Sequence, residues 1–205
     1  MDLTRRQTLA AALVSAAAAG LPGLAFAQAT PEVREMSMGD PNAPVTLVEY
    51  AMFTCPHCAA FAQDVLPKIK ENYIDTGKVR LVFREVYFNK PALWAAMIAR
   101  CAPQDRYFGV VDALFATQAS WASETDPQAM LGKLYGVGRQ AGLTDAEMDA
   151  CMQDRAMAEA LVAEYQKNAA ADAVDATPTF LINGEKVSNM SYEELAAKLD
   201  AALGA

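Results

Sequence analysis

The chain has 205 residues, of which 53% are hydrophobic and 20% are charged, and it contains four cysteines and one histidine. This composition suits a folded core and excludes a disordered tail, a collagen-like repeat and a disulfide-dense miniprotein. The formal net charge of -8 argues against nucleic-acid binding, because an acidic surface repels phosphate backbones. Sites that need several histidine ligands are also excluded, since His57 stands alone.

Residues 1–27 have the three parts of an export signal. They begin with an arginine pair, continue as an uncharged run of mainly alanine and leucine, and end in the small-x-small pattern Ala-Phe-Ala. We therefore expect cleavage after Ala27. The alternative is an uncleaved membrane anchor, but the alanine-rich run is weakly hydrophobic for a spanning helix. The arginine pair lies in TRRQTL, which resembles a twin-arginine signal, so the Sec and twin-arginine routes both stay open.

All four cysteines follow the predicted cleavage point. Disulfides persist in the oxidising compartments that exported proteins reach. An even number of cysteines in such a protein indicates catalytic or structural disulfides rather than resting thiols.

The first half of the mature chain predicts a strand followed by a helix. Residues 28–44 are turn-rich and contain GDPNAP, and the apolar run 45–50 then predicts a buried strand. After the motif Cys-Pro-His-Cys, apolar residues recur at four-residue steps over 61–73, which is typical of one face of a helix. Pro67 lies inside this helix, so we expect a kink in the turn before it.

A second strand and a long helical region come next. Apolar side chains alternate with Arg80 and Arg84 over residues 79–86 and predict the strand. Residues 91–172 are rich in alanine, leucine and methionine, show no strand pattern and predict several helices. A helical block of this length is large enough for a core of its own. We interpret it as a subdomain inserted into an α/β unit.

The C-terminal part predicts a hairpin and a final helix. Residues 177–182 predict a strand, and Asn183-Gly184 is a typical two-residue turn before the return strand. Ser191 and Glu194 have the spacing of a capping box at the start of the last helix.

The motif at residues 55–58 places two thiols at the start of a helix that follows a strand. Disulfide exchange needs one sulfur open to attack and a second within bonding reach, and this spacing supplies both. We expect Cys55 to be exposed and Cys58 to be more buried. The unpaired N–H groups and positive end of the helix favour a Cys55 thiolate. A stabilised thiolate makes the oxidised form a stronger electron acceptor.

His57 would add to this effect as a donor beside the Cys55 thiolate, and the alternative is a solvated side chain without a role. A Cys-X-X-Cys motif can also be half of a zinc site, but such a site needs another closely spaced ligand pair. Cys101 and Cys151 are far apart in the sequence, and there is no second histidine. We therefore expect no metal and no organic cofactor.

The chain as a whole resembles the DsbA family of exported thiol:disulfide oxidoreductases, which have a thioredoxin fold with a helical insertion. The resemblance rests on GDPNAP, on FTCPHC at residues 53–58, on the helical region and on TPTF at residues 177–180. We expect an α/β, thioredoxin-like domain over residues 28–89 and 173–205, interrupted by an all-helical subdomain over residues 90–172.

The resemblance also implies roles for individual residues. Cys55 is the expected nucleophile, Cys58 the resolving cysteine and Pro178 a cis-proline that packs against them. A cis bond would turn the Thr177 backbone toward Cys55, where it could pair with an extended substrate, whereas an ordinary trans-proline is the alternative. Glu49 matches an acidic family position and implies a buried carboxylate that helps Cys58 gain or lose its proton; a salt-bridged or exposed glutamate is the alternative.

Cys101 and Cys151 depart from the simplest family pattern, because many relatives have only the catalytic pair. Both fall in the predicted helical region. In an oxidising compartment we expect a structural disulfide between them, contributing about 2 to 4 kcal/mol. Two separately buried free thiols are the alternative.

These observations predict a periplasmic oxidase that donates its Cys55–Cys58 disulfide to reduced exported polypeptides. The resemblance implies a membrane partner of the DsbB type that reoxidises it, and we expect a monomer. An isomerase or reductase with the same motif is the alternative, although family isomerases usually carry an N-terminal assembly segment that this chain has little room for. A module that binds a soft metal such as Cu(I) through the two thiols is a weaker alternative.

Overall fold

A computed structural model describes residues 31–204. The predicted export signal, with its cleavage point after Ala27, lies outside these residues. The described chain is built around a mixed sheet with strand order β1-β3-β2-β4-β5. β2 and β3 are parallel neighbours, and the other pairings are antiparallel. The strands are β1 (Met36–Met38), β2 (Val45–Ala51), β3 (Val79–Glu85), β4 (Thr179–Ile182) and β5 (Glu185–Ser188).

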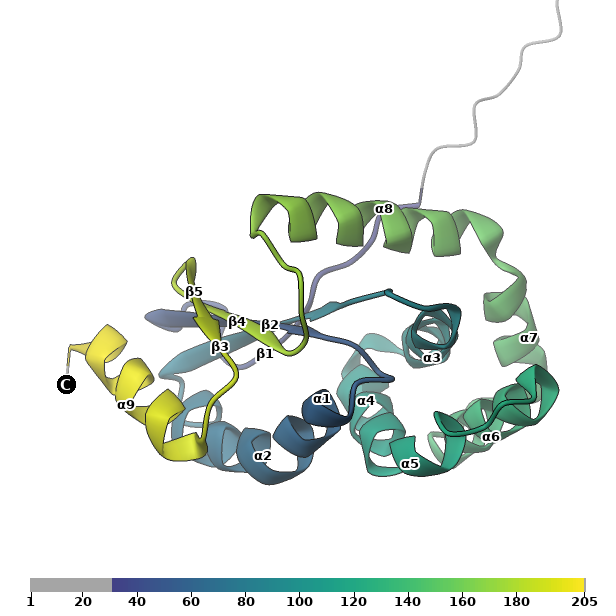
Figure 1. Cartoon of the computed structure of the whole chain (residues 1–205), viewed down its shortest axis with the longest axis horizontal. Helices are drawn as coiled ribbons and strands as arrows, with labels where there is room; N and C mark the ends of the chain where they lie inside the picture. Colours follow the sequence, from purple (N-terminus) through teal and green to yellow (C-terminus); the bar gives the residue numbers. More distant parts are fainter. Residues whose placement is uncertain (1–30, 205) are drawn as a thin grey trace, which may run out of the picture.

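Helices cover both faces of this sheet (Figure 1). The first helical segment and α9 (Tyr192–Leu203) lie on one face, where Leu47 packs with Leu195 in a buried cluster. α8 (Arg155–Ala171) lies on the other face, where Tyr50 packs with Ala169. The central strand β2 is therefore buried on both sides, which is why its sequence is almost continuously apolar.

β1 is a strand that the sequence analysis did not predict, since it treats residues 28–44 as turn-rich. The strand has only three residues, too few for an alternating pattern to stand out. It forms at the sheet edge because Met36 and Met38 pair antiparallel with Phe83 and Leu81 of β3. This contact joins segments far apart in the sequence.

The predicted helix after β2 is confirmed, but it is irregular. It consists of four consecutive segments, of which η1 and η2 both have wider π-helical turns. In η1, the Leu66 N–H bonds to the Phe61 carbonyl. Pro67, which has no N–H to donate, follows directly after this turn at the start of the next segment. A π-helical turn thus lies where the kink before Pro67 was expected. The segments are α1 (Pro56–Ala60), η1 (Phe61–Val65), α2 (Leu66–Ile69) and η2 (Lys70–Ile74).

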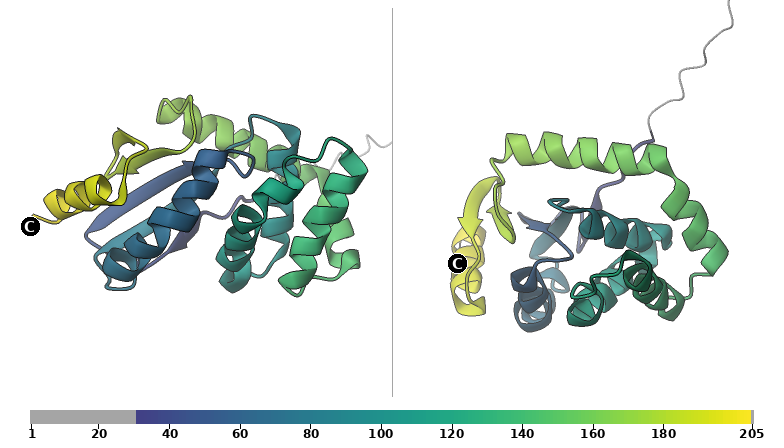
Figure 2. Two further views of the ribbon diagram at one scale, coloured as in Figure 1. Left: turned by 60° about the horizontal axis from the view of Figure 1, so that its bottom comes forward. Right: turned by 45° about the vertical axis from the view of Figure 1, so that its right-hand side comes forward.

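The helical region between β3 and β4 is also confirmed, and most of it lies to one side of the sheet (Figure 2). Its buried core includes Ile98, Leu114 and Leu134, and the same cluster contains Cys55 and Cys58. The helices therefore pack directly against the two thiols. Besides α8, they are α3 (Lys90–Cys101), η3 (Gln104–Arg106), α4 (Tyr107–Ala116), α5 (Gln118–Trp121), α6 (Pro127–Gln140) and α7 (Asp145–Gln153).

A disulfide between Cys101 and Cys151 links the end of α3 to α7. The two cysteines are separated by 50 residues, so the bond closes a large loop within the helical region. The alternative of two free thiols at these positions does not hold in the structure. No helix within residues 31–204 is long and apolar enough to cross a membrane.

The C-terminal hairpin and helix follow the sequence prediction closely. Asn183 and Gly184 both have positive φ, 50° and 89°, as a tight hairpin turn between β4 and β5 requires. The capping box of α9 is present, because Ser191 and Glu194 each bond to the other's backbone N–H.

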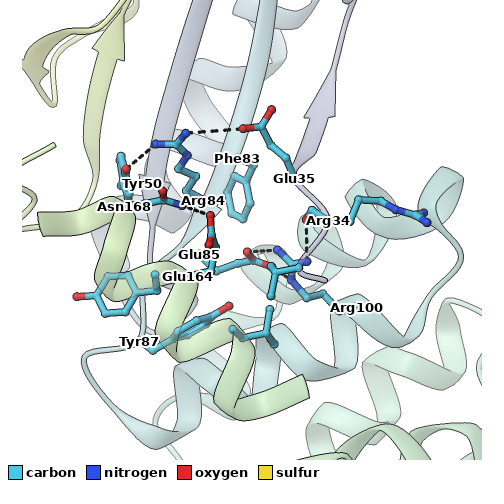
Figure 3. Close-up of a pocket in the computed structure, with 13 residues that line it drawn as sticks. Arg34, Glu35, Tyr50, Phe83, Arg84, Glu85, Tyr87, Arg100, Glu164 and Asn168 are labelled. Atoms are coloured by element: carbon cyan, nitrogen blue, oxygen red, sulfur yellow. Dashed lines mark hydrogen bonds and ion pairs between the residues drawn. The ribbon is translucent and has the colours of Figure 1, made fainter. Parts of the chain in front are cut away.

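A buried ion pair holds β3 to the helical region, beside a small cavity that α8 helps to line (Figure 3). Arg100 of α3 donates two hydrogen bonds of 2.6 Å to the two carboxyl oxygens of Glu85. Tyr107 of α4 donates a third at 2.7 Å. Glu85 is only 5% exposed, so its charge depends on these partners for compensation.

We predict that Glu85→Ala lowers the free energy of unfolding by about 3 to 5 kcal/mol, because it leaves the Arg100 cation buried without its partner. Urea-induced unfolding measures this loss. The matched control is Asp75→Ala, which breaks the half-exposed Lys70–Asp75 pair and should cost less than about 1 kcal/mol. Equal losses in the two variants would contradict the prediction.

Candidate active site

The two thiols of the Cys-Pro-His-Cys motif lie at the start of α1. Cys55 is the N-cap residue, with extended backbone angles, and Pro56 occupies the first helical position. Both cysteines are free thiols in the structure. Cys55 is 7% exposed and Cys58 is fully buried, so the expected order of burial is confirmed, but the expectation of an exposed Cys55 is wrong. The neighbouring helices and the loop before β4 cover most of its surface.

The surroundings of the two sulfurs separate their pKa values. The pKa of Cys55 is lowered to about 5, first by a hydrogen bond with the Cys58 thiol, then by the Thr177 side chain and by the backbone N–H groups of Cys58 and His57. Desolvation opposes this effect. The pKa of Cys58 is raised, because its proton is engaged with Cys55 and its sulfur is buried. At neutral pH the pair therefore holds one thiolate, on Cys55, and one thiol, on Cys58.

The His57 side chain is exposed at the surface. Within the described residues, its backbone N–H rather than its imidazole ring bonds the Cys55 sulfur. Residue 57 therefore stabilises the Cys55 thiolate through its backbone N–H, which is one of the unpaired donors at the helix start.

The loop before β4 brings Thr177 and Pro178 to Cys55. The Thr177–Pro178 peptide bond is cis, so the trans alternative does not hold. The Thr177 carbonyl oxygen lies 3.3 Å from Cys55 Sγ and accepts a hydrogen bond from it when Cys55 is protonated. The sequence separates these residues by 122 positions, and the antiparallel pairing of β4 with β2 brings them together.

Glu49 is a buried carboxyl group on β2. It is 1% exposed, and neither of its oxygens has a hydrogen-bond partner within residues 31–204. This burial excludes the alternative of an exposed or salt-bridged side chain and raises the pKa of Glu49 to about 8 by desolvation. The charge of Glu49 also contributes to the raised pKa of Cys58, so the two groups are electrostatically coupled.

Two further residues reach the Cys55 loop that the sequence analysis did not identify. Gln118 of α5 donates hydrogen bonds to the Phe53 and Cys55 carbonyl oxygens, each at 2.8 Å. Asn89, which caps α3, donates to the Thr54 hydroxyl at 2.9 Å. Neither residue carries a motif, and both act across long sequence separations. A glutamine within an apolar helical stretch was the available signal for Gln118.

Comparison with known proteins places this fold and site in a family. Residues 32–201 match the family model described as thioredoxin. The chain belongs to the thioredoxin family. Among solved structures, that of alpha-DsbA1 from Wolbachia pipientis is similar, with a TM-score of 0.78 and 29% identity over 86% of this chain and 94% of that one. The expected thioredoxin-like fold with DsbA-type neighbours is therefore confirmed.

Relatives within the thioredoxin family carry names that describe disulfide chemistry. A Rickettsia bellii protein, provisionally named a protein-disulfide oxidoreductase, is 31% identical over 170 residues. The match covers 82% of this chain and 64% of that protein, so the chain spans less than two thirds of its length. Disulfide bond formation protein D of Bacillus subtilis is 26% identical over 174 residues, which are 81% of this chain and 76% of that protein.

The lowered pKa of Cys55 predicts how its thiolate forms. We expect the ultraviolet absorbance of the thiolate in the reduced protein to rise with a midpoint near pH 5. Cys55→Ser should remove this transition, which assigns it to Cys55. A midpoint near 8.5, the ordinary value of a free cysteine, would contradict the prediction.

The raised pKa of Glu49 makes stability depend on pH. Between pH 4.5 and about 8, the folded protein keeps a proton that an unfolded Glu49 has released, so the contribution of Glu49 to stability falls as pH rises through this window. The lowered pKa of Cys55 acts in the opposite direction, in the wild type and in the variant alike. We expect reduced Glu49→Gln to be more stable than the reduced wild type by about 3 to 5 kcal/mol at high pH, where Glu49 is ionised in both states. At pH 4.5 the two should be equally stable, and urea unfolding measures both. A constant difference across the window would show that Glu49 does not titrate as described.

Proposed function

We propose that this protein is a thiol:disulfide oxidoreductase of the DsbA type that acts as an oxidase. The single observation that carries the proposal is the division of the two pKa values, lowered at Cys55 and raised at Cys58, at the start of one helix. A thiolate that is stabilised in the reduced protein stabilises the reduced form relative to the disulfide and raises the reduction potential of the pair. The protein then gives up its disulfide readily. The names of its relatives support the same chemistry.

In the proposed reaction, a substrate thiolate attacks Cys55 Sγ in the oxidised protein. The Cys55–Cys58 bond breaks, a mixed disulfide forms between the substrate and Cys55, and the Cys58 sulfur leaves with the electron pair and takes up a proton. A second substrate thiolate then attacks the substrate sulfur and releases Cys55 as a thiolate. The substrate dithiol is oxidised and the protein disulfide is reduced, so electrons balance. The low pKa of Cys55 favours the second step, because a thiol of low pKa is a good leaving group.

Glu49 has the burial and pKa that the Cys58 proton transfer needs. Cys58 has no exposed surface, so solvent does not reach its sulfur directly. A carboxyl group with a pKa of about 8 is largely protonated at neutral pH and is able to supply a proton on the buried side of the motif. We assign Glu49 this role.

Thr177 and Pro178 would position the substrate. The loop that carries them borders Cys55 and precedes β4. An extended substrate segment beside Cys55 would pair with the Thr177 backbone by strand addition. Main-chain pairing accepts many sequences, which suits a protein that acts on varied reduced polypeptides.

The remaining expectations form part of the same proposal. Residues 28–89 and 173–205 make up the thioredoxin-like domain, and residues 90–172 are the inserted helical subdomain. The protein acts as a monomer in the periplasm after export, and a membrane partner of the DsbB type reoxidises it. The likeness to disulfide bond formation protein D and to alpha-DsbA1 supports this setting.

The redox equilibrium with glutathione tests the oxidase assignment. We expect a midpoint potential on the oxidising side, closer to the value of about −120 mV for DsbA than to about −270 mV for thioredoxin. Cys58→Ser should accumulate a mixed disulfide with a substrate protein that carries a disulfide: the Cys55 thiolate attacks that disulfide, one substrate sulfur leaves as a thiolate, and no Cys58 thiol remains to release the substrate from Cys55. A potential near the thioredoxin value would contradict the oxidase and favour a reductase.

A further inference from the structure

Gln118 connects the helical region to the loop that carries the reactive cysteine. It is the first residue of α5, and it is 7% exposed. Its side-chain nitrogen donates one hydrogen bond to the Phe53 carbonyl and one to the Cys55 carbonyl, both 2.8 Å long. A primary amide has two N–H groups, so both are used. The side chain therefore ties together the carbonyl groups of the two residues that flank Thr54.

The Cys55 carbonyl is at a sensitive place, because it is also the acceptor for the first bonds of α1. The backbone N–H groups of Cys58 and Ala59 donate to it at 3.1 Å and 3.2 Å. The Cys55 N–H in turn bonds the Met52 carbonyl at 2.9 Å. Gln118 thus restrains Cys55, the residue at which the loop after β2 joins α1. The position of the Cys55 backbone determines how the N–H groups of the first helical turn point at the Cys55 sulfur.

The two hydrogen bonds are costly to lose because their acceptors are buried. Phe53 is 1% exposed and Cys55 is 7% exposed, so water has little access to replace a lost donor. A buried carbonyl without its donor tends to move toward another one. Loss of Gln118 would therefore shift the loop, and the Cys55 sulfur would lose alignment with its donors.

We propose that Gln118 is a positioning residue for disulfide exchange: it holds the Cys55 loop so that the helix start stabilises the thiolate, and it thereby lets the helical region set the oxidising strength of the motif. The inference deepens the proposed function and rests on it for its biological meaning. It concerns a residue outside the motif, on an element far from it in the sequence. Gln118 acts through Cys55 and does not itself react.

The chain contains a matched control for this residue. Gln63 of η1 also uses its side-chain nitrogen to donate to a backbone carbonyl, that of Phe115 in α4, at 3.1 Å. This bond likewise links the first helix to the helical region, but it does not touch the Cys55 loop. Gln63 is more exposed than Gln118 and makes one such bond, so its replacement removes a connection between the same two parts without disturbing the carbonyls of Phe53 and Cys55.

The experiment compares Gln118→Met and Gln118→Asn with Gln63→Met in the full mature protein. Methionine keeps the size of the side chain without the donors, and asparagine keeps the amide but is too short to reach. Two quantities are measured in each: the pKa of Cys55 from thiolate absorbance, and the equilibrium constant with glutathione. We expect both Gln118 variants to show a Cys55 pKa about one unit higher and an equilibrium shifted about tenfold toward the oxidised protein, or about 30 mV lower in potential. Gln63→Met should match the wild type in both.

Other outcomes decide against the proposal. A folded Gln118 variant with the wild-type pKa and equilibrium would overturn it, and so would an equal shift in Gln63→Met. Failure of both Gln118 variants to fold, seen by circular dichroism, would assign the two bonds to fold stability and overturn it as well. A wild type with the potential of thioredoxin would contradict the oxidase function, whereas the comparison of variants with wild type would still decide the role of Gln118.

Discussion

The charge on the Cys55 sulfur is the feature around which this part of the molecule is organised. A thiolate that is only 7% exposed is stable only when donors replace the lost water. The donors are the Cys58 thiol, the Thr177 side chain and the N–H groups of the first helical turn. They come from the helix start and from the loop before β4, so the sheet must bring β2 and β4 together before the sulfur can hold its charge.

Burial also raises the pKa of the Glu49 carboxyl group. Glu49 lies on β2 without a hydrogen-bond partner among the described residues, and its raised pKa keeps it largely protonated near neutral pH. A buried carboxyl group of this kind costs stability once it ionises. Its charge is coupled to that of Cys58, where the proposed reaction needs a proton. Under the proposed function, stability and activity would place opposite demands on this position.

Several elements could be predicted from local sequence because local physics decides them. The alternating and apolar strands β2 and β3, the Asn183–Gly184 turn and the capping box at Ser191 depend on residues close together in the chain. The edge strand β1 could not be predicted in this way, because pairing with β3 creates it. The near burial of Cys55 also escaped prediction, since the covering residues come from distant segments.

The sequence by itself determined the reactive pair, its place at a helix start and the helical region that interrupts the sheet, because spacing and periodicity encode all three. Tertiary structure alone decided which groups surround the sulfurs. It placed the Thr177 carbonyl 3.3 Å from Cys55 and the Gln118 amide 2.8 Å from the Cys55 carbonyl. Hydrogen bonds between residues so far apart in the chain leave no local pattern, since they form only when the elements pack.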